Sequence, residues 1–213
     1  MGRYIDAVCR LCRRQGEKLF LKGPKCYTEK CAATKRAFPP GQHGQSRGKG
    51  GRSKVSNYGV QLREKQKVKR IYGVREKQFR RYFLTAAKTK GVTGKVLLQL
   101  LERRLDNTIF RMGLAVSRVQ ARQIVRHNFV YVNSRRVNIP SFLVDKDDVV
   151  QVKGKDKAMN KIKDNFELSK DRTVPAWLEF DKSQFSAKVT RLPGKEDIQQ
   201  TIQEQLIVEL YSK

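Results

Sequence analysis

The sequence lacks the features that would place it in a membrane or outside the cell. It has no apolar run near the roughly 18 residues that a membrane-spanning helix needs. The first residues, Met1 to Asp6, contain no apolar signal-peptide core, and Asp6 stands where a myristoylation signal has serine or threonine. We therefore expect an intracellular, cytoplasmic protein with reduced cysteines and no membrane partner.

Groups for catalysis are also scarce. The chain has two histidines, His43 in a Pro- and Gly-rich loop and His127 at a predicted helix end. Neither has a nucleophile and a carboxylate nearby in the sequence, and there is no Walker motif, dinucleotide fingerprint or paired-histidine metal motif. We expect no enzymatic activity and no small-molecule substrate.

Acidic residues are few: 20 Asp and Glu stand against 47 Lys and Arg, which gives a net charge of +27. Residues 1–104 hold 28 of the basic side chains and six of the acidic ones. A compact protein with this charge repels itself, so we expect an anionic partner. The basic segments lack the aromatic and leucine-rich face of a membrane-surface helix, which favours nucleic acid over a membrane.

Cysteine is rare, but all four cysteines lie within 23 positions as two close pairs: Cys9 and Cys12, then Cys26 and Cys31. Two such pairs joined by a short loop can supply the four thiolates of a tetrahedral metal site. The neighbouring Arg10, Arg13 and Arg14 would favour thiolates and offset the negative charge of the site. We expect one structural Zn²⁺, with an iron–sulfur cluster or four unrelated cysteines as alternatives.

The rest of residues 1–104 divides into a loop and helices. Phe38 to Gly44 is a breaker cluster, followed by a Gly- and Ser-rich basic strap, residues 45–54. Residues 56–104 predict three helices: the first is capped by Ser56, the second ends near Gly91, and the third includes Leu105. The first helix has a partial apolar face: Val60, Leu62, Val68, Ile71 and Tyr72. The opposite faces are basic with few acids to pair with, which favours contact with phosphates over a merely solvated surface.

The second half predicts a mixed α and β module. Ser117 to Gln120 is a capping box that opens a short helix ending at His127. Strands are expected at residues 129–132 and 137–139 around a turn at 133–135, and then at 149–152. A helix at 156–169, strands near 177–180 and 187–192, and an apolar stretch at 206–211 follow. On the short helix Arg118, Arg122 and Arg126 fall four apart, so they share one face.

Several segments together resemble the bacterial family of small-subunit ribosomal protein four, over essentially the whole chain. They are Pro39–Gly44, Tyr58–Lys67, Arg70–Val74, Leu101–Asn107, Arg111–Leu114, Ser117–His127 and Leu206–Lys213. The four cysteines resemble the metal-binding branch of this family. The central module also occurs in pseudouridine synthases and some aminoacyl-tRNA synthetases, but no catalytic domain fits in the remaining residues. A free regulator of mRNA is a further alternative.

The resemblance implies an α+β fold in which a helix–β-hairpin RNA-binding module is inserted into a helical domain with an N-terminal four-cysteine metal knuckle. We expect the knuckle and strap at 1–54, the helical domain at 55–94 completed by 186–213, and the module at 95–185. The implied role is that of a structural small-subunit protein that binds rRNA and nucleates assembly of the subunit body. The resemblance also implies ribosomal protein five as a neighbour, a place near incoming mRNA, a part in decoding accuracy, and in some bacteria repression of its own operon. We expect no homo-oligomer.

Lys and Arg contacts to phosphate should dominate binding, with specificity from RNA shape. We expect RNA contacts in the module from Arg104, Arg111, Arg118, Arg122, Arg126, His127, Asn133, Arg135 and Arg136. Further contacts are expected from Arg63, Lys67 and Arg70 and from the strap residues Arg47, Lys49, Arg52 and Lys54. Asp106 is expected to cap or pair internally. Many family members have glycine where this chain has Asn128, Ser134 and Asp147, so we expect positive φ there, with Ser134 the least comfortable.

Overall fold

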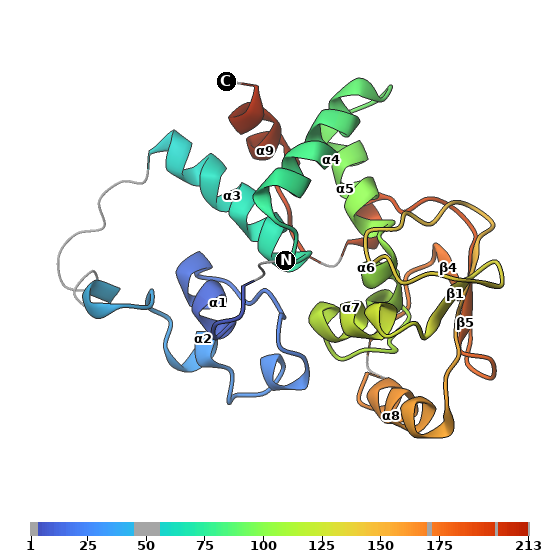
Figure 1. Cartoon of the computed structure of the whole chain (residues 1–213). Helices are drawn as coiled ribbons and strands as arrows, with labels where there is room; N and C mark the ends of the chain where they lie inside the picture. Colours follow the sequence, from blue (N-terminus) through green and yellow to red (C-terminus); the bar gives the residue numbers. More distant parts are fainter. Residues whose placement is uncertain (1–3, 45–55, 170–171, 199, 213) are drawn as a thin grey trace. The chain divides into compact units, whose positions relative to one another are not determined.

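The computed structural model describes residues 4–44, 56–169, 172–198 and 200–212 (Figure 1). The chain divides into two compact units. The helical unit runs to Arg81 and takes in the chain again from Ile202, and the mixed unit is Tyr82–Thr201. The strap residues Arg47, Lys49, Arg52 and Lys54 lie outside the described residues. None of the described helices is long and apolar enough to cross a membrane.

The cysteine-bearing segment of the helical unit consists of short helices joined by tight turns. These are α1 (Cys9–Gln15), η1 (Pro24–Cys26), α2 (Ala32–Lys35) and η2 (Gln42–Gly44). α1 ends at Gly16, whose φ of 83° favours glycine. Among residues 4–44 the buried apolar side chains are Leu19 and three cysteines, so sulfur atoms take the place of an ordinary core.

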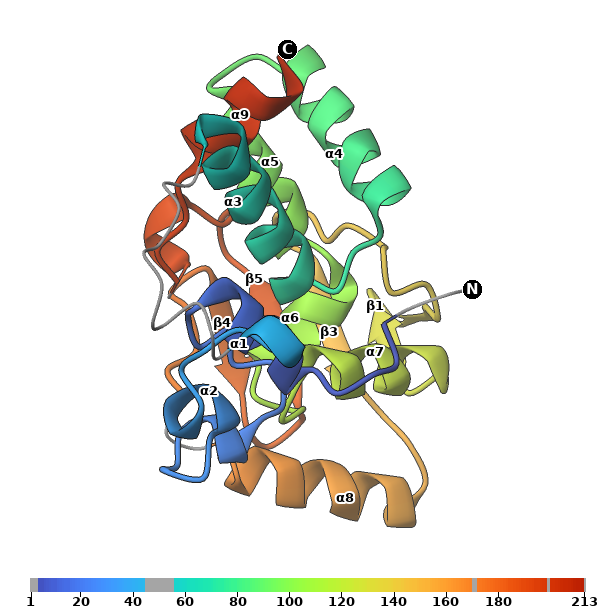
Figure 2. The same cartoon turned by 90° about the vertical axis from the view of Figure 1, so that its left-hand side faces the viewer.

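Two helices distant in sequence pack against each other in the rest of this unit. α3 (Asn57–Ile71) begins at Ser56, whose hydroxyl accepts a 3.2 Å hydrogen bond from the Gly59 N–H, which confirms the predicted cap. α9 (Glu204–Tyr211) lies along α3 in both views (Figures 1 and 2). The Gln61 side chain donates a 2.9 Å hydrogen bond to Glu209. The last residues of the chain thus return to the helical unit.

The predicted apolar face of α3 was wrong in part. Val60 is 41% exposed, whereas Gln61 and Lys65 are buried at 6% and 8%. α9 brings the Glu209 carboxylate to Gln61, and α4 (Glu76–Lys88) brings the Glu76 carboxylate to Lys65. Buried polar groups need such partners, and the local sequence of α3 does not show them.

After α4, the mixed unit has two helices where the sequence predicted one. α5 (Thr93–Glu102) stops before Leu105, and α6 (Leu105–Arg111) starts there. Between them Arg104 forms an isolated antiparallel bridge with Leu143, and the Leu105 N–H donates to Phe142 O at 2.8 Å. The chain near residues 140–144 therefore uses the backbone groups that would have continued α5.

The predicted short helix and antiparallel sheet complete the unit, which confirms an α+β fold. α7 (Arg118–Arg126) buries Ala121, Ile124 and Val125 as predicted. The sheet order is β2-β1-β3-β5-β4, antiparallel throughout, and α8 (Asp156–Glu167) adds Ile162 to the same core. The strands are β1 (Val130–Val132), β2 (Arg135–Arg136), β3 (Val149–Val152), β4 (Leu178–Asp181) and β5 (Ser186–Val189).

The hairpin turn is tighter than the sequence indicated. Asn133 and Ser134 both have positive φ, 48° and 66°, as a two-residue hairpin turn requires. Arg135 therefore pairs directly with Val132, and β2 lies at 135–136 rather than at 137–139. Positive φ also occurs at Asn128 and Asp147, so the expectation for all three glycine-replacing positions is confirmed.

Candidate nucleic-acid interface and cysteine site

The row of arginines on α7 consists of Arg118, Arg122 and Arg126. Ser117 caps the helix by accepting a 3.3 Å hydrogen bond from the Gln120 N–H. The other half of the predicted capping box differs, because Gln120 accepts from the Val116 N–H and not from Ser117. Arg126 is exposed, while Arg118 and Arg122 are half-buried.

Acceptors on α6 hold the two half-buried arginines of this row. Asn107 Oδ1 accepts a 2.8 Å hydrogen bond from Arg118 Nε. The Arg118 guanidinium also lies 4.4 Å from the centroid of the Phe110 ring, within cation–π range. Arg122 Nη1 lies 3.5 Å from Asp106 Oδ2. α6 therefore fixes where these two cations sit along α7.

Arg104 and Arg111 have a different environment from the row. Arg104 is 1% exposed and makes two hydrogen bonds to Asp106, at 3.0 and 2.7 Å, and one to the Tyr82 hydroxyl. Burial disfavours its charge, but Asp106 outweighs this and raises the pKa of Arg104. The internal role predicted for Asp106 is confirmed.

Arg111 is 7% exposed and makes two hydrogen bonds to Glu102, which is fully buried. Glu102 also accepts a 2.8 Å bond from Asn107, which links this ion pair to Arg118. Arg111 thus joins α6 to α5, while Arg104 links Asp106 of α6 to Tyr82 of α4, and neither arginine forms part of the exposed surface. Their predicted contact with RNA stays a prediction, and it would require these ion pairs to open.

The hairpin turn places further polar side chains at the surface. Asn133, Arg135 and Arg136 are all exposed. The Asn133 amide ties the turn to the next strand, because it donates to Asp148 at 2.7 Å and accepts from the Val149 N–H at 2.9 Å. His127 is exposed at the end of α7, with its ring 6.2 Å from that of Phe129. Of the module residues predicted to contact RNA, Arg126, His127, Asn133, Arg135 and Arg136 are therefore exposed.

The cations of α3 are less available than the sequence indicated. Lys67 is 6% exposed and pairs with Glu17 at 2.7 Å. Lys65 and Lys69 both pair with Glu76, at 2.8 and 2.9 Å. Acids from outside the helix therefore neutralise these lysines. Arg63 is exposed, and Arg70 is half-buried, where burial and then Arg14 lower its pKa.

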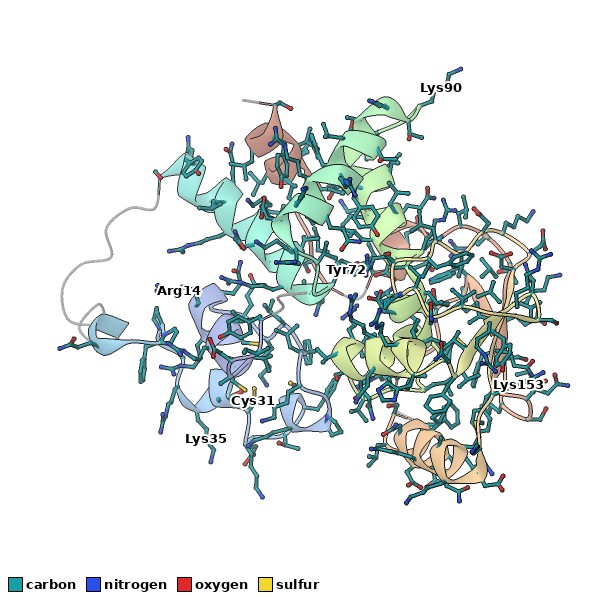
Figure 3. The ribbon with its side chains drawn as sticks, in the orientation of Figure 1. Arg14, Cys31, Lys35, Tyr72, Lys90 and Lys153 are labelled. Atoms are coloured by element: carbon teal, nitrogen blue, oxygen red, sulfur yellow. The ribbon has the colours of Figure 1, made fainter. Side chains whose placement is uncertain are left out.

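The four cysteines converge on one small cavity. Cys9, Cys12, Cys26 and Cys31 line it together with Val8, Leu21, Lys22 and Ala33. Figure 3 shows Cys31 in this segment with further sulfur atoms close by. None of the four forms a disulfide. Within the described residues, however, no group of three or more His, Cys, Asp or Glu side chains is arranged as a metal site.

The electrostatic surroundings of the thiols differ from one to the next. Burial, with smaller contributions from the other three cysteines, raises the pKa of Cys12. Burial also acts to raise the pKa of Cys31, but N–H groups of Ala33 and Thr34 outweigh it and lower that pKa. Arg13 was expected to support the thiolates; instead it donates to Phe38 O at 3.1 Å and to Arg36 O at 3.2 Å.

Two family models match consecutive parts of the chain. A family model described as Ribosomal protein S4/S9 N-terminal domain matches residues 3–102, and one described as S4 domain matches residues 103–150. The small ribosomal subunit protein uS4 of Pelotomaculum thermopropionicum is 57% identical over 213 residues, which cover all of both chains. The proteins of the same name from Thermodesulfovibrio yellowstonii and Geobacter sp. are 55% and 56% identical, again over both full lengths. The chain belongs to the uS4 family of small ribosomal subunit proteins.

Proposed function

We propose that this protein is a structural constituent of the bacterial small ribosomal subunit that binds small-subunit rRNA. The observation that carries the proposal is the exposure of three arginines, Arg126, Arg135 and Arg136, within the part of the chain matched by the S4 domain model. Because the family consists of ribosomal structural proteins, we assign no catalytic activity.

Phosphate contacts supply most of the affinity in the proposed complex. Arg126, Arg135 and Arg136 are exposed at the surface, and the Tyr131 hydroxyl orients the Arg136 guanidinium. Arg118 and Arg122 are oriented by Asn107 and Asp106, so less side-chain freedom is lost when they bind. The A-form major groove is deep and narrow, so recognition depends on RNA shape rather than on base edges in that groove.

A more specific role in subunit assembly and decoding is proposed from the family resemblance. We propose that binding is an early step that nucleates assembly of the subunit body, beside ribosomal protein five and close to incoming mRNA. A contribution to decoding accuracy and repression of its own message belong to the same proposal. The protein would act as a single copy on cytoplasmic ribosomes, with the strap residues contacting rRNA or facing mRNA.

Gradient fractionation of a bacterial lysate tests this role. The tagged full chain should sediment with the small subunit, in about one copy per particle, and remain there through a moderate salt wash. A free regulator of mRNA would instead stay near the top of the gradient. That second outcome, in cells where the tagged chain replaces the native copy, would contradict the ribosomal role.

For the cysteine site we propose one structural Zn²⁺, with an iron–sulfur cluster as the alternative. Four thiols on one cavity are a suitable donor set for either, and a bound ion would cross-link a segment whose core holds few other apolar side chains. Cys9, Cys12, Cys26 and Cys31 would be the ligands.

Elemental analysis of the purified protein, with a visible absorption spectrum, distinguishes the possibilities. One zinc per chain, lost in a Cys26→Ser variant, is the expected result. Iron with visible absorption would support the cluster. A metal-free protein with four titratable thiols that is fully folded would contradict both.

A further inference from the structure

One face of the five-stranded sheet turns away from the core. Val130, Val132, Val150 and Val152 point inward and pack in the core with Ala121, Ile124 and Val125 of α7. Side chains alternate along a strand, so Tyr131 and Gln151 point to the opposite face. Tyr131 pairs with Arg136 on β2 and with Gln151 on β3. This outer face is therefore separate from the arginine row of α7.

Tyr131 lies between two cations on this face. Arg136 donates two hydrogen bonds to the Tyr131 hydroxyl, from Nη2 at 3.1 Å and from Nε at 3.3 Å. The Arg136 guanidinium lies 5.6 Å from the ring centroid and the Lys153 ammonium 6.0 Å from it. Lys153, labelled in Figure 3, lies at the outside of the unit. The arrangement holds a half-exposed aromatic ring in a fixed orientation with positive charge around it.

The charge of the outer face changes sign across the sheet. At the other edge, β4 carries the exposed Glu179 and Asp181. Glu179 lies opposite Lys188 of β5, and the Lys188 ammonium is 3.4 Å from Asp147. Acidic groups therefore surround the Lys188 ammonium near that edge. Arg136 and Lys153, in contrast, lie beside Tyr131 and form no ion pair with the described residues. An anionic partner fits the β2–β1 side of this face only.

We propose that Tyr131 is a stacking platform for an unpaired RNA base, with Arg136 and Lys153 at the adjoining phosphates. This proposal rests on the proposed rRNA-binding function. Aromatic rings flanked by cations suit single-stranded or bulged nucleotides, because the base needs an open face for stacking. A base in a continuous duplex is already stacked on its neighbours. The module would then contact RNA on two faces, with phosphates on α7 and an unpaired base on the sheet.

The test compares Tyr131 variants on two RNA probes of equal length, an oligouridylate and a fully paired duplex. Tyr131→Ile keeps a strand-forming residue but removes the ring, so it should weaken oligouridylate binding by about 5- to 100-fold and leave duplex binding unchanged. The slope of log K against log salt should not change, since no cation is lost. Tyr131→Phe retains the ring and should retain most of the affinity.

Val149→Thr is the matched control, because Val149 is an exposed position of the central strand β3 on the same face of the sheet, and the change keeps a strand-forming residue there. It should bind both probes like the unmodified protein. Tyr131→Ile that binds the oligouridylate normally, or that weakens both probes equally, would overturn the proposal.

A Tyr131→Trp variant gives a second readout if the isoleucine variant does not fold. The one native tryptophan, Trp177, is fully buried and supplies a constant background. Oligouridylate should quench the new fluorescence more than the duplex does, and an equal response would overturn the proposal. Failure of the rRNA-binding role itself would look different: the unmodified protein would not distinguish small-subunit rRNA from an unrelated RNA.

Discussion

Arg126 is the member of the α7 row that is exposed and not held by α6. We expect Arg126→Ala to weaken binding to RNA of any sequence by a similar factor. The magnitude of the slope of log K against log salt concentration should fall by about one. The thermal unfolding temperature should not change. Lys163→Ala, an exposed change on α8, serves as the control and should alter none of these quantities. An unchanged salt slope for Arg126→Ala would remove this residue from the phosphate contacts.

Ser134 adopts a φ of 66°, which costs an ordinary L-residue about 1–2 kcal/mol. Glycine has no such cost but loses more backbone entropy on folding, by about 0.5–1 kcal/mol. Ser134→Gly should therefore raise the free energy of unfolding by up to about 1 kcal/mol, measured by denaturant titration. Ser186→Gly, in ordinary strand backbone, should lower it. A destabilising Ser134→Gly would contradict the account of this turn.

The joint between α5 and α6 depends on buried charge. Glu102→Gln leaves the Arg111 guanidinium buried opposite a neutral amide, and breaking a buried pair in this way costs about 3–5 kcal/mol. The loss should appear in denaturant unfolding of the full chain, while Glu167→Gln, an exposed change on α8, should cost little. A loss below about 1 kcal/mol for Glu102→Gln would show that the pair does not hold the joint.

The contact of α3, α4 and α9 depends on Glu76. Burial acts to raise the pKa of Glu76, but hydrogen bonds from two lysines and a tyrosine outweigh it and lower the pKa to about 2. The donors are Lys65, Lys69 and Tyr211. Because the folded-state pKa is below the ordinary value of 4.5, this stabilisation is fully present above about pH 4.5 and is lost as the pH falls towards 2.

The Glu76 side chain is 46% exposed, so solvent screens the interaction and we expect a contribution of about 1 kcal/mol. Glu76→Gln should lower the free energy of unfolding by that amount at pH 7 and by progressively less as the pH approaches 2. Denaturant titrations of both proteins across this range measure the difference. A difference that stays constant with pH would contradict the assignment.

The sequence predicted correctly those helix caps and turns that depend on interactions between residues close together in the chain. Ser56 and Ser117 cap their helices, and Asn128, Ser134 and Asp147 have positive φ, because hydroxyl caps and turn residues act within a few positions. The break between α5 and α6 was missed, since it depends on hydrogen bonds from a loop about 40 residues away.

The same distinction applies to the candidate site. Spacing on one helix predicted that Arg118, Arg122 and Arg126 share a face. It did not show that Glu102 pairs with the buried Arg111, or that Glu17 neutralises Lys67, because these partners come from other elements. Tyr131 and Lys153 were missed for a similar reason: their proximity exists only once the strands pair.

Over the whole chain, a net charge of +27 remains even though several cations of α3 and α6 are paired internally. The exposed cations must therefore account for RNA binding, and its strength should fall steeply with salt. A protein that bound through charge alone would have the same affinity for any RNA of equal length. Recognition of one RNA requires the cations to be fixed in place, as Arg118 is by Asn107 and Arg136 by Tyr131.

Titration of the purified protein with small-subunit rRNA and with an unrelated RNA of equal length, across a series of salt concentrations, tests this claim most directly. We predict that the rRNA complex persists at salt concentrations that dissociate the unrelated RNA, because the fixed surface adds contacts that depend on RNA shape. Equal affinity and an equal salt slope for both RNAs would show a non-specific polycation and contradict the proposed role.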